Sequence, residues 1–161
     1  MQSGFGSRKQ QDDFIWALHL AQPPNPGPPP NYRGVTDFEQ LATFIGQEPD
    51  DFGHPSWVNG WSSFLHSFFF FKQVSFFSKR PLALFTLEEQ AFLAASAEIL
   101  CNRFSLPVPD WVSEPCYVLP ELSAPEAWLR LQSAIEDPAA TAHPTYLKHN
   151  VIARDRDLLV L

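Results

Sequence analysis

The side chains best suited to catalysis or metal binding are two cysteines and five histidines, and their spacing forms no recognisable site. No two histidines stand four residues apart, so no helix face carries a zinc-binding pair. Cys101 and Cys116 form no Cys-x-x-Cys motif and have no histidine at ligand spacing, which argues against structural zinc. A disulfide between them is geometrically conceivable, but two reduced thiols are the simpler interpretation. The histidines are His19, His54, His66, His143 and His149.

Other catalytic motifs are missing from the sequence. It has no Gly-x-Ser-x-Gly elbow and no dinucleotide fingerprint, and its 7 glycines leave little material for a phosphate-binding loop. The acid pair Glu88 and Glu89 falls in a first helical turn, where the helix dipole explains it without catalysis. We therefore expect no catalytic residue, no metal and no cofactor. A small enzyme with a Cys/His or carboxylate site assembled in space remains an alternative.

Composition indicates one globular domain that is unsuited to nucleic acid. The chain has 161 residues, of which 45% are hydrophobic, and its 15 Phe and 5 Trp supply a large core. Residues 84–138 hold nine acids and two bases, a surplus that equals the net charge of −7. With a pI of about 5.1 and no Arg/Lys cluster, direct nucleic-acid binding is not expected. The acidic region favours either a basic partner or simply solubility.

The N-terminal part predicts a polar leader, a helix and a stiff connector. Residues 1–11 are polar, have no apolar signal-peptide region, and are expected to be flexible, so we expect a cytoplasmic protein. Asp12 or Asp13 is suited to cap a helix that ends near Ala21. Apolar side chains cover most of its circumference, which predicts either deep burial or docking on a partner. Six prolines in residues 22–31 indicate a polyproline connector rather than a recognition motif.

The middle of the chain predicts two further helices. Thr36 and Glu39 form a capping box that opens a helix with Phe38, Leu41, Phe44 and Ile45 at core spacing, and Gly46 ends it. Ser56 is predicted to cap the next helix. The Phe-rich run 61–77 predicts a buried helix, or a helix followed by a short strand. At 17 residues with two cationic or titratable side chains it is at the lower limit for a membrane span, so membrane association is not expected.

The last 76 residues predict two capped helices joined by a rigid corner. A capping box at Thr86 opens a helix that runs to about Phe104, and Pro107 and Pro109 prevent its continuation. Asp110 is expected to cap a short turn. A third capping box begins at Ser123 and opens a helix that ends at Asp137-Pro138. Short apolar runs at 151–153 and 158–161 predict a small hairpin or an irregular packing tail.

These residues carry the one family resemblance in the sequence. Leu106-Pro107-Val108-Pro109-Asp110-Trp111-Val112, Trp128-Leu129-Arg130 and Pro144-Thr145-Tyr146-Leu147-Lys148-His149-Asn150-Val151 lie in order, before an Arg/Asp-rich close. This pattern over Thr86–Leu161 resembles the C-terminal region of bacterial proteins encoded in toxin–antitoxin-like pairs. The resemblance implies a helical accessory or antitoxin-like protein that holds a protein partner. Such proteins often carry an N-terminal helix-turn-helix, and none is recognisable here.

The sequence therefore predicts a mainly α protein, one compact multi-helix domain over residues 12–161, that binds a protein partner without catalysis. An assembly or membrane-surface subunit that uses the Phe-rich helix is a further alternative. The oligomeric state is left open. The residues expected to contact the partner are Trp111, Trp128, His149, Asn150, Arg154 and Arg156.

Overall fold

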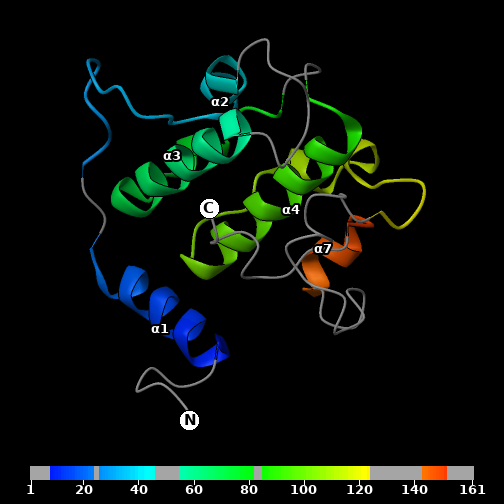
Figure 1. Cartoon of the computed structure of the whole chain (residues 1–161), viewed down its shortest axis with the longest axis horizontal. Coiled ribbons are helices and arrows are strands. Elements are labelled where there is room, and N and C mark those ends of the chain that lie inside the picture. The colour runs from blue at the N-terminus through cyan, green and yellow to red at the C-terminus, as the bar shows by residue number, and fades with distance from the viewer. Residues whose placement is uncertain (1–7, 24–25, 46–54, 82–84, 124–142, 152–161) are drawn as a thin grey trace.

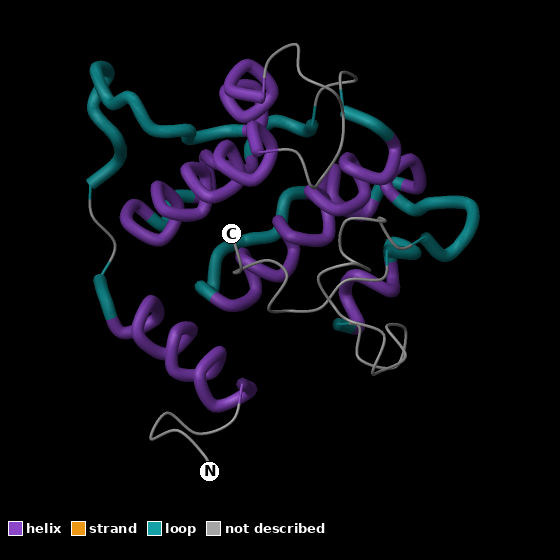
Figure 2. The backbone as a smooth tube through the Cα atoms, in the orientation of Figure 1, coloured by secondary structure: helices purple, strands orange, loops and turns teal. Residues whose placement is uncertain are grey.

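The computed structural model describes residues 8–23, 26–45, 55–81, 85–123 and 143–151, and this part of the chain is mainly α (Figure 1). Helices and connecting loops account for all of it, with no strand (Figure 2). The mainly α fold is thereby confirmed. The α-helices are α1 (Arg8–Ala21), α2 (Phe38–Ile45), α3 (Pro55–Phe71), α4 (Leu87–Arg103) and α7 (Pro144–Lys148), and the 3₁₀ turns are η1 (Val74–Phe77), η2 (Asp110–Ser113) and η3 (Pro115–Tyr117).

Helix α4 is the centre of the described structure. Its predicted capping box is confirmed: the Thr86 hydroxyl accepts from the Glu89 amide at 3.2 Å, and the Thr86 amide donates to the Glu89 carboxylate at 2.7 Å. Every residue from 91 to 101 is buried. Four of these eleven are alanines, whose small side chains let neighbouring elements approach the helix on all sides.

Aromatic side chains join α2, α3 and α4 into one core. Trp61 lies parallel to Phe64 with ring centroids 5.3 Å apart, and edge-on to Phe92 of α4 at 5.3 Å. Phe38 of α2 stacks on Phe64 at the same distance. Pairs of this kind add about 0.5–1.5 kcal/mol each beyond the burial of their area. The Phe-rich run therefore serves the interior of the protein.

The Phe-rich run forms a helix and then a turn. Helix α3 ends at Phe71, and η1 returns Phe76 and Phe77 to the core, where they are 1% and 0% exposed. The expected short strand is therefore wrong, because the two phenylalanines reach the core through a 3₁₀ turn. Within the described residues, no helix is both long and apolar enough to cross a membrane.

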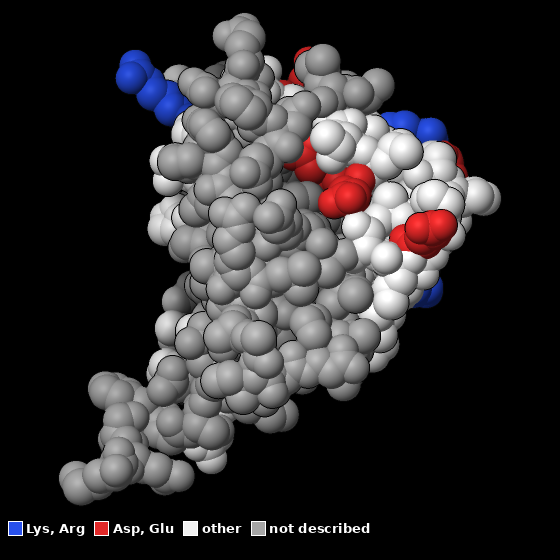
Figure 3. Space-filling model, turned by 45° about the vertical axis from the view of Figure 1, so that its right-hand side comes forward, with Lys and Arg blue, Asp and Glu red and all other residues white. Residues whose placement is uncertain are grey.

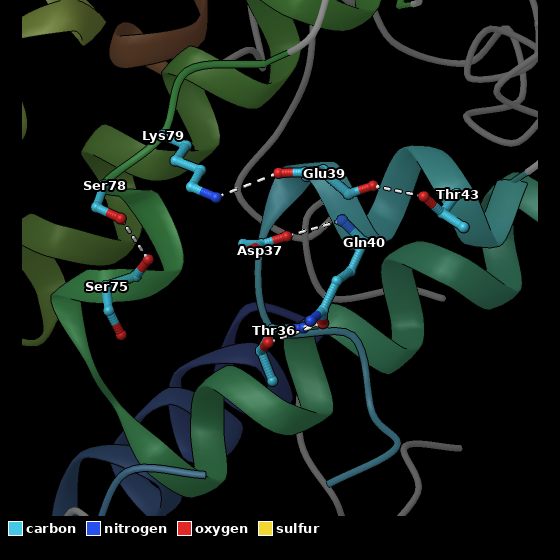
Figure 4. Close-up of polar contacts among 8 residues, drawn as sticks. All are labelled: Thr36, Asp37, Glu39, Gln40, Thr43, Ser75, Ser78 and Lys79. Carbon is cyan, nitrogen blue, oxygen red and sulfur yellow. Dashed lines mark hydrogen bonds and ion pairs between the residues drawn. The ribbon is translucent and has the colours of Figure 1, made fainter. Parts of the chain in front are cut away.

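Helix α2 begins one residue later than its predicted capping box. Asp37 is the cap, and its carboxylate accepts from the Gln40 amide at 2.7 Å (Figure 4). The Gln40 side chain in turn accepts from the amide and the hydroxyl of Thr36, both at 2.8 Å. Asp37 therefore has the capping role predicted for Thr36, and the Gln40 side chain has the role predicted for Glu39. Phe44, expected in the core, is 50% exposed.

Two other helix starts differ from the prediction. Helix α1 begins at Arg8, so residues 8–11 of the expected leader are helical and Asp12 and Asp13 are not caps. Arg, Lys and Gln are good helix formers, which allows the helix to extend toward the N-terminus. Helix α3 begins at Pro55, a residue favoured at the first helical position, rather than after Ser56.

Three helices end at a residue other than glycine in the left-handed region. Lys72 has φ 50°, Ser105 has φ 57° and Asn150 has φ 61°. After α4, the Leu106 amide donates to the Cys101 carbonyl at 2.8 Å and the Ser105 amide to the Asn102 carbonyl at 3.4 Å. This is a Schellman motif, which satisfies the last carbonyls of the helix.

The short helix α7 was not predicted. Pro144 occupies its first turn, the His143 side chain accepts from the Thr145 amide at 3.1 Å, and Asn150 follows its last turn. After α7, Val151 forms an isolated parallel bridge with Ser123. The predicted helix from Ser123 to Asp137 lies outside the described residues beyond its first position, as does the tail after Val151.

Candidate partner-binding surface

The structure places Trp111, predicted as a partner contact, in the core. The side chain is 6% exposed, and its indole N–H donates to the Phe77 carbonyl at 2.8 Å. Its ring packs edge-on against Tyr117 at 5.2 Å and Phe38 at 6.1 Å. The corner at Pro107 and Pro109 precedes η2, which places the indole against α2 and η1 instead of in solvent.

His149 and Asn150 hold two distant segments of the chain together. His149 is 1% exposed, and its Nδ1 donates to the Tyr117 carbonyl at 2.8 Å, because a carbonyl can only accept. The Asn150 side-chain amide donates to the Leu119 carbonyl at 2.6 Å. Both residues were predicted as partner contacts; the structure places His149 in the interior, and the amide of the half-buried Asn150 is engaged internally. Trp128, Arg154 and Arg156 lie outside the described residues.

Polar contacts also fix α7 against α4, beside which it lies in Figure 1. The hydroxyls of Ser96 and Tyr146 are 2.8 Å apart in the interior. Lys148 donates to both oxygens of Glu98, at 2.7 and 2.9 Å. The Tyr146 ring stacks on Phe92 at 5.5 Å and 3°. Helix α7 is thereby a fixed support for the segment that His149 and Asn150 bind.

That segment forms one wall of an open groove at the start of α4. The groove, of about 320 Å³, is lined by Leu87 and Glu88 on one side and residues 119–123 on the other. Leu87 is 62% exposed and Leu122 is 52% exposed. We call these residues the leucine groove. Its exposed leucines and its two exposed carboxylates, Glu88 and Glu121, suit an apolar side chain beside a cationic one.

Both walls of the leucine groove have rigid supports. The Thr86 capping box fixes Leu87 and Glu88, while hydrogen bonds to residues 149 and 150 fix the other wall: the Leu119 amide donates to the His149 carbonyl at 3.1 Å, and the Ser123 amide to the Asn150 carbonyl at 2.8 Å. The groove is therefore preformed. Figure 3 shows acidic groups spaced over a largely uncharged part of the described surface.

A second groove of about 320 Å³ lies between residues 32–35 and α2, lined by Tyr32, Arg33, Gly34, Val35, Gln40, Thr43 and Phe44. The Tyr32 hydroxyl lies 2.9 Å from that of Ser67. A side chain at Gly34 would meet the Tyr32 ring at 2.5 Å and the Ser67 hydroxyl at 2.7 Å, so this position requires glycine. Unlike the leucine groove, this groove has no Asp or Glu among its lining residues.

The described residues do not assemble a thiol-based catalytic site. Both cysteines are free. Burial raises the pKa of the Cys101 thiol to about 12, which keeps it neutral and unreactive, as expected of a core cysteine. Cys116 is exposed, and its sulfur lies 3.8 Å from Glu114, whose carboxylate forms a bidentate pair with Arg80 at 2.6 and 2.7 Å. Within the described chain, no three His, Cys, Asp or Glu residues gather as a metal site.

Two rings of helix α1, those of Trp16 and His19, pack on the rest of the protein. Trp16 is 2% exposed and lies edge-on to Phe69 at 6.1 Å, while the Arg103 guanidinium stands 4.2 Å from its ring centroid. His19 stacks on Phe69 at 4.0 Å. Burial lowers the pKa of His19, and the charges of Lys72 and His66 lower it further.

The remaining apolar side chains of α1 face solvent. Phe14 is 67% exposed, Ile15 38%, Leu18 48% and Leu20 47%. Deep burial, the first of the two outcomes predicted for this helix, is therefore wrong. A large exposed apolar surface on one helix is typical of a contact site.

Comparisons with known proteins add no relative to this description. Protein families, curated proteins and solved structures all return no match to the chain.

Proposed function

We propose that this protein is a non-catalytic binding protein that docks on a protein partner through the leucine groove. The observation that carries the proposal is a preformed groove with exposed Leu87 and Leu122 beside two carboxylates. The partner class we propose is a segment with an apolar side chain next to Lys or Arg. An antitoxin-like or regulatory accessory protein, as the resemblance implies, is the specific form of this role. A cytoplasmic location belongs to the same proposal.

Burial of the groove leucines is the energetic basis of this binding. Apolar surface removed from water contributes about 25 cal/mol per Å², and Leu87 and Leu122 are each more than half exposed before a partner binds. The carboxylates of Glu88 and Glu121 contribute chiefly to partner choice and association rate, since exposed charges add little affinity. The fixed walls reduce the entropy lost on binding.

Affinity purification with quantitative comparison of retained proteins tests the proposal. Leu122→Ser removes the apolar contact, and the double variant Glu88→Gln/Glu121→Gln removes two negative charges. The double variant Asn31→Lys/Asn102→Lys is its matched control, since both asparagines are exposed and lie outside the groove, and the net charge changes equally. We expect one stoichiometric partner to fall at least tenfold in both groove variants and to be retained by the control.

A partner retained equally by all variants would place its contact elsewhere and overturn the proposal. Circular dichroism and thermal unfolding of each variant establish that the fold is intact. Because Leu122 is exposed, its substitution is expected to change the unfolding free energy by less than about 0.5 kcal/mol.

A further inference from the structure

The proline connector between α1 and α2 presents an exposed ridge. Residues 26–29 belong to no helix, strand or turn. Pro28 and Pro29 each have a fixed φ and each precede another proline, which disfavours the α region and favours the polyproline II conformation. Figure 1 shows this segment along the outer edge of the described structure, and Figure 2 shows it as a loop.

Three residues make one turn of a polyproline II helix, so the segment has three edges. Pro26 and Pro29 therefore share one edge. Gly27 and Pro30 share the next, and all four residues, which we call the proline ridge, are exposed. Pro28, on the third edge, is half-buried. A side-chain carbon added to Gly27 would meet no atom within 4 Å, so the space beside the ridge is open.

Both ends of the connector are held at the C-terminal end of α3. Before the ridge, the Lys72 ammonium group donates to the Gln22 carbonyl at 2.7 Å. After the ridge, the Tyr32 amide closes a turn by donating to the Pro29 carbonyl at 3.0 Å, while the Tyr32 ring packs edge-on to Phe71 at 5.1 Å. A segment with fixed ends and locked φ angles loses little conformational entropy when a partner binds it.

We propose that the proline ridge is a docking site for a protein domain whose groove is lined with aromatic rings. Such grooves bind polyproline II segments, because flat tryptophan and tyrosine rings pack on a ligand that is already ordered. The sequence pattern predicts a connector, and the exposure of Pro26 and Pro29 at Pro-x-x-Pro spacing adds the recognition role. Arg33 is exposed beyond the turn, which suits a carboxylate beside the partner's groove. The ridge is separate from the leucine groove and does not depend on it.

NMR titration of the isotope-labelled full chain with panels of isolated SH3, WW and EVH1 domains tests the proposal, since these domains carry such grooves. At least one domain is expected to bind with a dissociation constant below ~1 mM and to shift the amide signals of Gly27 and Asn31. The signals of Leu87 and Leu122 in the leucine groove should not move. Failure of all the domains to bind at ~1 mM overturns the proposal, as do shifts confined to the leucine groove.

Two proline-to-alanine variants separate the ridge from the stiffness of the connector. Pro29→Ala removes a ring from the exposed edge, and we expect the affinity for the bound domain to fall by roughly tenfold or more. Pro28→Ala is the matched control, because it loosens the same segment from the half-buried edge, and its affinity should stay within about twofold of wild type. Arg33→Gln should slow association at low salt and have little effect at high salt. Equal affinities of the two proline variants would contradict the proposal.

Discussion

Helices α1 and α4 have similar sequences in one respect and opposite environments in the structure. Apolar side chains surround most of the circumference of both. All residues of α4 from 91 to 101 are buried, whereas Trp16 is the one fully buried side chain among the described positions of α1. The large exposed residues of α1 are Phe14, Ile15, Leu18 and Leu20.

The difference teaches that side-chain size and capping decide which outcome an all-round apolar helix reaches. Helix α4 has alanines that admit neighbours on every side and a complete capping box at Thr86. Helix α1 has bulky side chains and no acidic residue in its first turn. It precedes all the core elements in the sequence. The first pattern builds an interior, and the second leaves large apolar side chains exposed to solvent.

The same substitution in the two helices should give the largest contrast. Phe92→Ala removes a ring that is 1% exposed and packs on Trp61 and Tyr146, so we expect a loss of about 3–5 kcal/mol in unfolding free energy. Phe14→Ala removes a ring that is 67% exposed, and the expected change is within about 0.5 kcal/mol. Chemical denaturation of both variants measures the difference. Equal losses would show that α1 belongs to the core.

Trp16→Ala should separate α1 from the core without unfolding the core. The substitution removes the buried anchor and its contact with Arg103, and we expect the loss of this burial to lower the stability of the docked helix by about 1.5–3 kcal/mol. We expect limited proteolysis to cut within residues 8–23 more rapidly, while α4 keeps its protection. A matched Phe14→Ala variant should be cut at the wild-type rate. Simultaneous loss of protection in α1 and α4 would contradict two separable regions.

Ser105→Gly should strengthen the end of α4 by a smaller amount. Ser105 is exposed and has φ 57°, a conformation that glycine adopts without steric cost. We expect the free energy of unfolding, measured by chemical denaturation, to rise by about 0.5–1 kcal/mol. Lys72→Gly is the contrasting control, because Lys72 has φ 50° but also donates to Gln22 next to α1. A gain in the Lys72 variant equal to that in the Ser105 variant would show that this link to α1 adds nothing.

A fall in pH should loosen α1 and leave α4 in place. Burial first, and then Lys72 and His66, lower the pKa of His19 below its ordinary 6.5, so the docked helix favours the neutral ring. The stabilisation is complete above pH 6.5 and is lost as the pH falls through the lowered pKa. Fluorescence of an α1 probe between pH 7 and 5 measures the release. His19→Phe keeps the stacking on Phe69 and should abolish the pH dependence.

The parts of the fold that local chemistry determines could be predicted from the sequence. The helix opened by Thr86 and the buried phenylalanines of the middle segment follow from capping and periodicity, and the structure confirms them. Helix α7 could have been found from Pro144 in a first turn and Asn150 at a helix end, since these residues favour those positions. It was missed because five residues carry too little periodicity.

The surface could be predicted far less well than the fold. A tryptophan near a Pro-rich corner suits either docking or packing, and the contacts of Trp111 with Phe77 and Phe38, both distant in sequence, show that it packs inside. The hydrogen bonds of His149 and Asn150 join residues about 30 positions apart, which no local pattern encodes. Leu87 and Leu122 line one groove for the same nonlocal reason. The sequence did indicate that α1 would be buried or would bind a partner, without choosing between them.

Hydrogen exchange of α1 and α4 tests the central claim most directly. The claim is that α4 belongs to the core, whereas α1 is a separable helix held chiefly by Trp16. We expect α4 amides to exchange only on global unfolding. Amides of α1 should exchange faster than those of α4 and faster still in Trp16→Ala, in which the α4 rates stay unchanged. Exchange of α1 at the rate of α4 in both proteins would contradict the account.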